Sequence, residues 1–455
     1  MLDLKVVNGT LFIPGVGLVS SGLGVKDGKI AMIASDDLLP DAKEVVDAGG
    51  HYVIPGCIDP HVHLGIFSTY EGECETETRY ALSGGVTTIG VFMGGGESYL
   101  PTLPDAIATA EAKSSTDLFF HLSIFTPEQM SEMDQYCDRF GVTDFKFYMT
   151  GVKGVFPNVE DDFIREGFSK IASMGFPAIG CVHCEDQSQV DAGWEAVGAL
   201  SDPTLKDWTG SSPSGAEADA ARRFVNIARE TGARAYMVHM SSREAVELLT
   251  EMFKDGRSNI FIETTSAYCG MTNEDPIGKL AKMVPPIRDK DAQESLWKAV
   301  QSGVVSTFGT DNVSCGTSLK GGEGDSLLQA MPGYPVVGTH IPVLLTEGYH
   351  NRGIPWTTII EKATKAPAEA FGLYPRKGTI AVGSDADLVI LDLDKEKVVD
   401  PKEEYSFSDF SLFQGRTLKG WPTRVIKGGK VAVVDGKVVS DPGIGCYLRR
   451  TLSRG

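Results

Sequence analysis

One pattern constrains the fold of this chain more than any other: strand-like and helix-like segments alternate through its middle. Eight runs rich in apolar and β-branched residues recur, and most are followed by a stretch with apolar residues at helical spacing. The runs cover residues 53–59, 86–93, 118–125, 144–149, 178–183, 235–240, 260–265 and 304–311. Eight strand-then-helix units are typical of a parallel (β/α)8 barrel like that of triosephosphate isomerase (a TIM-like barrel), so we predict this α/β fold for residues 56–365.

Both ends of the chain have a different character. Residues 1–55 read as short strands with hairpin signals at Asn8-Gly9 and Asp27-Gly28. The segments 386–391 and 424–439 repeat this style near the C-terminus. Because chain termini often lie close in space, we expect residues 1–55 and 366–455, the C-terminal tail included, to form one small β-sandwich domain beside the barrel.

The charge and the cysteine content of the chain limit the classes of function that it can have. Lys and Arg number 42 against 61 Asp and Glu, and this net charge of −19 disfavours a nucleic-acid partner or an anionic membrane surface. The residues Met1 to Lys5 do not begin a signal peptide, and no apolar run approaches the roughly 18 residues of a membrane helix. The eight scattered cysteines favour reduced thiols in a cytoplasmic protein, and we interpret Cys181 and Cys184 as structural.

Six chemically active side chains fall at or near the ends of the predicted strands. They are His61, His63, Lys146, His183, His239 and Asp311. The active sites of (β/α)8 barrels lie at the C-terminal ends of the strands, so these side chains are expected to converge there.

The types of these residues indicate a metal site. In an extended segment, residues i and i+2 point the same way, so His61 and His63 can bind one ion, while His183 and His239 can serve another. Imidazoles with a carboxylate suit Zn²⁺, Mn²⁺, Fe²⁺, Co²⁺ or Ni²⁺. Lys146 lies between two phenylalanines, where its charged form is costly. A neutral lysine can take up CO₂ to form a carbamate whose two oxygens bridge two metals.

Each of these residues alone has a simpler interpretation, as a buried histidine, a surface lysine or a helix N-cap. Their joint placement favours the metal site. We interpret the other histidines, His51, His121, His340 and His350, as structural, although His121 can also face the barrel. The glycine-rich stretches 94–96 and 321–324 lack the nucleotide-binding patterns, so we expect mobile loops at the active site, and the chain has no serine-hydrolase G-x-S-x-G.

Several motifs together resemble one family. They are VIPGCIDPHVH at 53–63, GGVTT at 84–88, FKF at 145–147, PPIR at 285–288, FGLYPRKGTI at 371–380 and GSDADLV at 383–389. On these residues, which span nearly the whole chain, the sequence resembles the cyclic amidohydrolases of the amidohydrolase superfamily. The resemblance is to the branch of dihydropyrimidinases, hydantoinases and allantoinases.

The resemblance implies a role for each of the six residues. His61, His63 and Asp311 would hold one divalent metal and His183 with His239 the other, with carbamylated Lys146 (N6-carboxylysine) as the bridge. Asp311 would also be the catalytic acid and base. The implied reaction is opening of a small cyclic amide or imide, such as a hydantoin or dihydropyrimidine, by a hydroxide that two metals share, most often zinc. The family also implies a homotetramer or homodimer.

The chain departs from this family at possible substrate contacts. Gly151 stands where hydantoinases carry a tyrosine that stabilises the oxyanion, five positions after the lysine, and Tyr148 and Tyr268 are candidates to replace it. Val284 stands for a serine, Gly333 for a loop asparagine and Asn312 for a histidine. These changes favour a hydantoinase-like or dihydropyrimidinase-like activity on an unusual ring.

Other readings of the sequence stay open. Within the same class they are an allantoinase or another cyclic imidase or lactamase. A dihydroorotase is disfavoured, because its substrate-binding arginine is Gly65 here. The alternative from a different class is a non-catalytic scaffold like the dihydropyrimidinase-related proteins, which have lost metal ligands, and the six intact positions argue against it.

Overall fold

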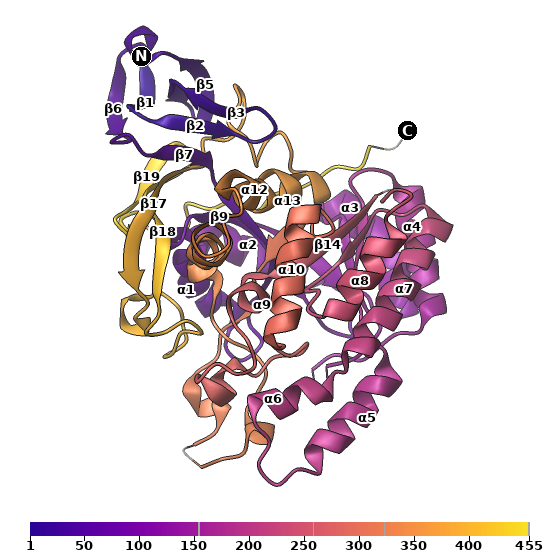
Figure 1. Cartoon of the computed structure of the whole chain (residues 1–455). Coiled ribbons are helices and arrows are strands. Elements are labelled where there is room, and N and C mark those ends of the chain that lie inside the picture. Colours follow the sequence, from indigo (N-terminus) through magenta and orange to yellow (C-terminus); the bar gives the residue numbers. More distant parts are fainter. Residues whose placement is uncertain (153–154, 258, 323, 454–455) are drawn as a thin grey trace.

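The computed structural model describes residues 1–152, 155–257, 259–322 and 324–453. Within these residues, a nine-stranded parallel sheet curls into a barrel with the strand order β15-β14-β13-β12-β11-β10-β9-β8-β16 (Figure 1). The strands are β8 (Cys57–His63), β9 (Val86–Met93), β10 (Asp117–Ser123), β11 (Asp144–Tyr148), β12 (Ile179–His183), β13 (Ala235–Met237), β14 (Ile260–Thr265), β15 (Thr307–Gly309) and β16 (Asn312–Val313). The pairing of β16 with β8 closes the barrel, which confirms the predicted (β/α)8 fold.

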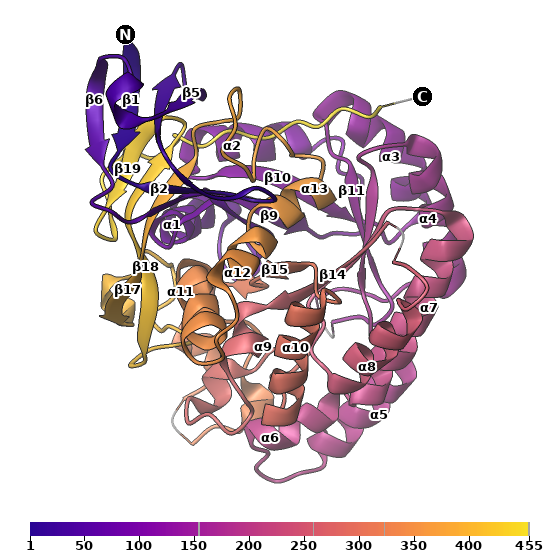
Figure 2. The same ribbon diagram turned by 45° about the horizontal axis from the view of Figure 1, so that its top comes forward.

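Helices surround this barrel (Figure 2). They are α1 (Tyr70–Ser83), α2 (Leu103–Lys113), α3 (Pro127–Phe140), α4 (Asp161–Met174), α5 (Gln187–Gly198), α6 (Leu205–Trp208), α7 (Ser214–Thr231), α8 (Arg243–Met252), α9 (Ser266–Gly270), α10 (Lys290–Ser302), α11 (His340–Leu344), α12 (Trp356–Lys362) and α13 (Lys365–Ala370). A search of the described helices for a segment with the length and apolarity needed to cross a membrane finds none.

Helix α3 shows how the sequence sets the ends of these helices. Thr126 accepts a hydrogen bond from the backbone of Gln129, whose side chain reaches back to the Thr126 backbone, and Pro127 fits the first turn. Gly141 ends the helix in the left-handed conformation, with a φ of 69°. Apolar residues such as Met133 lie on the buried face, so the helix packs against the barrel.

Strands from both chain ends build two further sheets. The four-stranded sheet has the order β5-β4-β1-β6 and the seven-stranded sheet the order β20-β19-β18-β17-β7-β2-β3. The strands are β1 (Leu2–Val7), β2 (Thr10–Ile13), β3 (Gly17–Ser20), β4 (Gly22–Lys26), β5 (Lys29–Ala34), β6 (Ala42–Asp47), β7 (Tyr52–Pro55), β17 (Leu388–Val398), β18 (Thr417–Lys427), β19 (Lys430–Val434) and β20 (Lys437–Val438). Leu4, Leu23, Val53 and Leu388 share one hydrophobic core, so residues of both chain ends pack together as predicted.

The first predicted barrel strand, residues 53–59, is wrong as a single strand. Strand β7 pairs with β17 in the end sheet, whereas β8 is the first strand of the barrel. Gly56 lies between them, and its N–H donates to the carbonyl of Asp387 at 2.7 Å. A Cβ atom at Gly56 would lie 2.1 Å from Oγ1 of Thr87. The chain therefore passes from one sheet to the other at a position that only glycine fits.

The C-terminal tail differs from the expectation that it belongs to the sandwich. It runs along the barrel (Figure 2), where Leu448 N–H donates to the Leu118 carbonyl at 2.8 Å and Arg450 N–H donates to the Gly141 carbonyl at 3.1 Å. These backbone bonds replace the sheet pairing that the tail would make in the sandwich. The domain boundaries 1–55, 366–455 and 56–365 stay a prediction.

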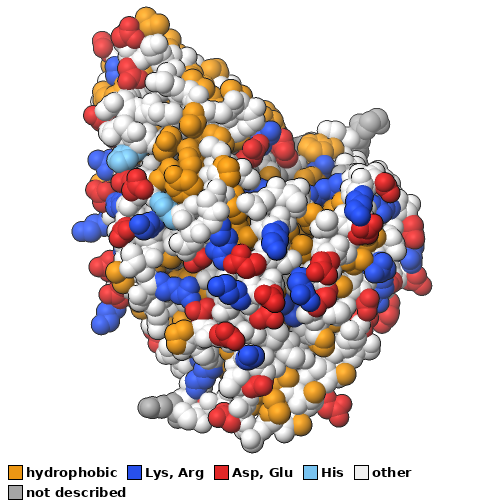
Figure 3. Space-filling model, viewed as in Figure 1, with side chains coloured by type: hydrophobic (Ala, Val, Ile, Leu, Met, Phe, Trp, Pro, Cys, Tyr) orange, Lys and Arg blue, Asp and Glu red, His pale blue; other side chains and the backbone are white. Residues whose placement is uncertain are grey.

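The surface carries charges of both signs. Figure 3 shows acidic and basic side chains interspersed over the barrel helices, and a group of hydrophobic side chains beside the end sheets. In the β2–β3 hairpin, Val16 is 74% exposed and Leu18 51% exposed.

Candidate functional site

The ends of the barrel strands surround a cavity. All six predicted site residues line it: His61, His63, Lys146, His183, His239 and Asp311. The remaining lining residues are Ile66, Phe67, Tyr148, Val152, Val155, Phe156, Met283, Val284, Val313 and Pro332. The cavity therefore combines a cluster of titratable groups with a largely apolar wall, as expected of a site for a small organic molecule.

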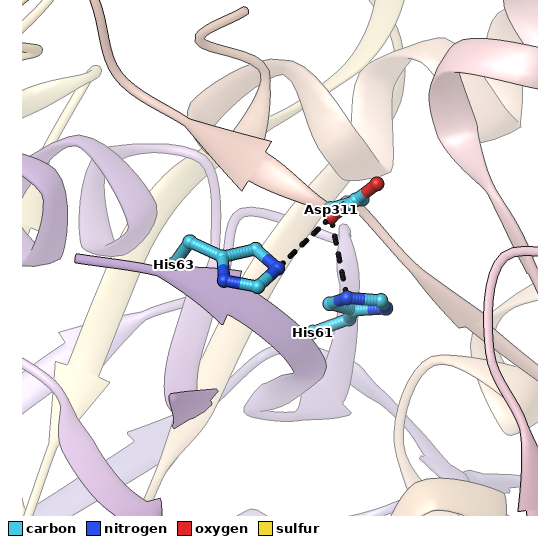
Figure 4. Close-up of side chains that lie close together, drawn as sticks. All are labelled: His61, His63 and Asp311. Carbon is cyan, nitrogen blue, oxygen red and sulfur yellow. Dashed lines mark ion pairs between the residues drawn. The ribbon is translucent and has the colours of Figure 1, made fainter. Parts of the chain in front are cut away.

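His61, His63 and Asp311 form the tightest group in the cavity (Figure 4). Nε2 of each histidine lies 3.2 Å from Oδ1 of Asp311. Asp311 follows β15 with a φ of 55°, and its N–H donates to the His61 carbonyl at 2.9 Å. The ligand atoms of the three residues all lie within 4.8 Å of one another, so this group can hold a metal ion.

The charges around Asp311 keep it ionised. Burial acts to raise the pKa of its carboxyl, but His61, His63 and Lys146 outweigh burial and lower the pKa to about 2. Burial also lowers the pKa of His63. At neutral pH the group therefore has a carboxylate and a neutral His63 imidazole, the states that bind a cation.

A buried glutamate that the sequence analysis missed supports this group. Oε1 of Glu263, in β14, lies 2.7 Å from Nδ1 of His61 and accepts the backbone N–H of His239 at 2.9 Å. The Tyr236 hydroxyl donates to Oε2 at 2.8 Å. A carboxylate at Nδ1 places the ring proton there and leaves the lone pair on Nε2, toward Asp311. The signal available in the sequence was an acidic residue inside the apolar run 260–265.

His183 and His239 form a second group. Nδ1 of His183 lies 2.9 Å from Nε2 of His239. On its other side, Nε2 of His183 lies 2.7 Å from Oε2 of Glu185, and the other carboxylate oxygen of Glu185, Oε1, accepts the Ser212 hydroxyl. Burial first, and His183 second, lower the pKa of His239 well below its usual range. His239 follows β13 with a φ of 38°, a strained conformation that aims its ring into the cavity.

Lys146, in β11, is 2% exposed. Its Nζ lies 4.8 Å from the ring centre of Phe92 and 5.1 Å from that of Tyr148. The described residues place no carboxylate within ion-pair distance of this Nζ. Burial lowers the pKa of Lys146 to about 8, so part of the population carries a neutral, nucleophilic amine near neutral pH.

The four predicted substrate contacts divide into two pairs. Tyr148 and Val284 line the cavity. Gly151 and Gly333 are absent from the described lining, although their neighbours Val152 and Pro332 belong to it. The Gly151 N–H donates to Gln187 Oε1 at 2.9 Å, and the Gly333 carbonyl accepts from the Lys320 ammonium.

The other candidates from the sequence have structural partners. The Tyr268 hydroxyl donates to the Pro285 carbonyl at 2.8 Å, so its proton is already used. Nε2 of His121 lies 3.0 Å from the Pro60 carbonyl. Asn312 accepts the Val336 N–H at 2.8 Å and donates to Glu77 at 3.2 Å. Gly94 packs against the ring of Phe156 at the cavity wall, and Glu323 of the second glycine-rich stretch lies outside the described residues.

The chain is similar to known proteins along nearly its whole length. The model of the amidohydrolase family matches residues 52–432. The chain is 30% identical over 460 residues to an L-hydantoinase of Paenarthrobacter aurescens, covering 99% of this chain and 98% of that protein. It is 32% identical over 465 residues to a D-hydantoinase of Geobacillus stearothermophilus, covering 98% and 96%. It is also 32% identical over 461 residues to an allantoinase of Rubrobacter xylanophilus, covering 100% and 99%.

Solved structures agree with the sequence relatives. An L-hydantoinase (dihydropyrimidinase) from Arthrobacter aurescens superposes with a TM-score of 0.92 at 29% identity, covering 99% of this chain and 100% of that one. A D-hydantoinase (dihydropyrimidinase) from Thermus sp. superposes with a TM-score of 0.90 at 29% identity, covering both chains completely at 100%. Because these likenesses extend over the barrel and both chain ends, the protein belongs to the amidohydrolase family.

Proposed function

We propose that this protein is a metal-dependent hydrolase that opens a cyclic amide or imide at a ring C–N bond. One observation carries the proposal: four histidines, an aspartate and a lysine without a carboxylate partner among the described residues converge on one cavity with an apolar wall. The named relatives, hydantoinases and an allantoinase, support the same reaction class.

The donor atoms fit two divalent ions. His61, His63 and Asp311 would hold one ion, because Nε2 of both histidines faces Oδ1 of Asp311. His183 and His239 would hold the other, because Nδ1 of His183 faces Nε2 of His239. Lys146 fits as the shared ligand only after taking up CO₂ as a carbamate, since its ammonium would repel the ions. Zinc is the first candidate, and manganese, iron, cobalt and nickel suit the same donors.

The chain's own groups account for proton movement. Bound divalent ions supply a water of lowered pKa and polarise the substrate carbonyl. The Asp311 carboxylate accepts the proton of the attacking water and returns it to the ring nitrogen that leaves. Among the described side chains of the wall, Tyr148 alone carries a neutral hydrogen-bond donor. We assign its hydroxyl to the carbonyl oxygen that gains negative charge, in the position of the missing tyrosine at Gly151.

The composition of the cavity wall also favours some candidate substrates over others. Apart from the six site residues and Tyr148, its described side chains are apolar. Such a wall favours a hydantoin or dihydropyrimidine ring with an apolar substituent over allantoin, whose ureido group needs polar partners. The hydantoinase and allantoinase relatives have nearly the same sequence identity to this chain, 30–32%, so allantoin stays the second candidate substrate.

Two further parts of the proposal concern the oligomeric state and the cellular location of the enzyme. We propose a homo-oligomer, a tetramer or dimer, and the exposed apolar residues Val16 and Leu18 support an interface at the β2–β3 hairpin. We also propose a reducing, cytoplasmic location, supported by eight free cysteines, of which only Cys446 is exposed.

A ring-opening assay tests the proposal. The panel contains hydantoin, 5-substituted hydantoins, dihydrouracil, allantoin, dihydroorotate, succinimide and simple lactams. The protein is supplied with zinc or manganese and bicarbonate, beside a chelator-treated control. Turnover of one ring that disappears on chelation supports the function and names the substrate class. Absence of bound metal together with absence of turnover would favour the non-catalytic scaffold instead.

A further inference from the structure

One side of the cavity wall is made by two loop segments far apart in the sequence. Met283 and Val284 come from the loop before α10, and Pro332 comes from the loop that follows β16. Around them the described residues form short 3-10 turns, Gly278–Ala281, Thr317–Lys320 and Leu327–Gln329. Because turns of this length do not fix a wall by themselves, other bonds must hold the two segments at their separation.

Lys320 joins the two segments. Its side chain is fully buried, at 0% exposed. Its Nζ donates to the Met331 carbonyl at 2.8 Å, to the Lys282 carbonyl at 3.4 Å and to the Gly333 carbonyl. An ammonium has three N–H donors, so each has a carbonyl partner. The Lys282 carbonyl directly precedes the wall residue Met283 on one segment. The Met331 and Gly333 carbonyls lie on either side of the wall residue Pro332 on the other segment.

Lys282 adds a second link in the same place. Its Nζ donates to the Leu328 carbonyl at 3.0 Å and lies 4.3 Å from the ring centre of Trp208. Its own carbonyl accepts the Gly333 N–H at 3.0 Å. We name this set, Lys320 and Lys282 with the carbonyls that they bind, the lysine clasp.

The charges of the clasp are unusual for purely structural lysines. In the described part of the chain neither ammonium has a carboxylate within ion-pair distance, and burial lowers the pKa of each to about 8. An apolar side chain would fill the same volume without the cost of burying a cation. The carbonyl contacts, together with the Trp208 ring beside Lys282, distinguish lysine from such a side chain. The position of the wall is therefore what the lysines supply.

We propose that the lysine clasp determines substrate specificity by setting the separation of Met283 and Val284 from Pro332, and thereby the size of the ring substituent that the cavity accepts. Lys320 is then a positioning residue, which acts through these wall residues and touches neither the six site residues nor the substrate. The inference rests on the proposed ring-opening function.

The test compares two rings in one variant. In Lys320→Met, KM for 5-benzylhydantoin is expected to rise about tenfold or more, while KM for unsubstituted hydantoin and kcat for both rings change little. The exposed Lys298 on α10 supplies the matched control Lys298→Met, which should leave both rings unaffected. A merely structural role would lower turnover of both rings alike, because it would reduce the folded fraction. An equal effect on both rings, or none, overturns the proposal.

A second measurement is independent of turnover. Hydrogen exchange, followed by mass spectrometry on the metal-loaded protein, should accelerate in the peptides that hold Met283–Val284 and Gly333 in Lys320→Met, and not in Lys298→Met. If the wild-type protein opens no ring, the proposed function fails while this result still supports or overturns the clasp. Should Lys320→Met not fold, Lys282→Met is measured in the same way, with the same direction expected. Unchanged exchange in that variant would overturn the clasp.

Discussion

The two halves of the candidate metal centre are built differently. In the half made by His61, His63 and Asp311, the ligand atoms lie within 4.8 Å of one another and include a carboxylate. In the other half, His183 and His239 face each other across 2.9 Å, and the third member is Lys146, whose ammonium repels cations. The first half is therefore complete as polypeptide, whereas the second half requires Lys146 to change its charge.

The halves also differ in what holds them. His61 and His63 lie on one strand, and Asp311 reaches them through the hydrogen bond from its N–H to the His61 carbonyl. Lys146, His183 and His239 come from three successive strands of the barrel, where Glu185 contacts the His183 ring and Glu263 accepts the His239 N–H. One strand thus supplies two of the three ligands of the first half, while three separate strands supply the members of the second.

The largest effect is expected from breaking the complete half. His61→Ala removes one ligand and the partner of Glu263, so kcat/KM for the ring that the protein opens should fall by about 10⁴-fold or more, with loss of bound metal. The matched control is His51→Ala, in the end domain, which should keep full activity. A fully active His61→Ala would show that the metal assignment is wrong.

Breaking the incomplete half should have a smaller and partly reversible effect. Lys146→Ala removes the amine that takes up CO₂, and activity should fall on the order of 10³-fold. The space left by the side chain admits a small carboxylate, so added acetate or propionate should restore part of the activity in Lys146→Ala but not in His61→Ala. Steady-state kinetics with and without the acid measures this, and equal rescue of both variants would contradict the difference between the halves.

The supporting glutamates sharpen the comparison. Glu263 contacts both halves, at Nδ1 of His61 and at the His239 N–H, whereas Glu185 contacts only His183 among the site residues. Glu263→Gln should therefore weaken zinc binding by nearly 100-fold and Glu185→Gln by about 10-fold. Competition with a chromophoric chelator gives both constants. A larger loss in Glu185→Gln would mean that Glu263 does not couple the halves.

The sequence predicted the parts of this fold that depend on local periodicity. The eight units are visible because each strand and helix has its own apolar pattern. The change of sheet at Gly56 is not, because residues 53–63 read as one apolar segment although β7 and β8 belong to different sheets. The path of the C-terminal tail along the barrel is not visible for a similar reason, since backbone bonds to distant residues such as Leu118 decide it.

In the candidate site, too, the features with a local sequence pattern could be predicted, and those that depend on distant contacts could not. That the six residues line one cavity could be predicted because the strand ends of a barrel meet at one place, which the order along the chain implies. Glu185 and Glu263 were missed, although an acidic residue next to a site histidine or inside an apolar run is a usable signal. The contacts of Lys320 had no such signal, because it binds backbone carbonyls that every residue has.

The smallest effect concerns stability in the absence of metal and CO₂. Burial lowers the pKa of Lys146 to about 8, from 10.5. Because the folded protein then binds this proton less tightly than the unfolded chain, the lysine destabilises the fold at pH values below about 8, and the penalty fades as the pH approaches 10.5. Lys146→Met removes the charge at similar volume, so at pH 7 the metal-free variant should be more stable by about 1–3 kcal/mol.

Urea unfolding of chelator-treated protein at pH 7 and at pH 10 measures this difference, with Lys298→Met as the control for loss of an exposed lysine. The stabilisation should shrink at pH 10, because the wild-type lysine is then neutral in the folded state. The same variant should have lost its activity. Lys146 would then be shown to lower the stability of the metal-free fold while being required for the reaction. A stability difference that does not change with pH would mean that the folded and the unfolded protein bind this proton equally, so that burial does not lower the pKa of Lys146. Lys146 would then stay fully charged at neutral pH, and the second half would have to lose that charge without help from the fold.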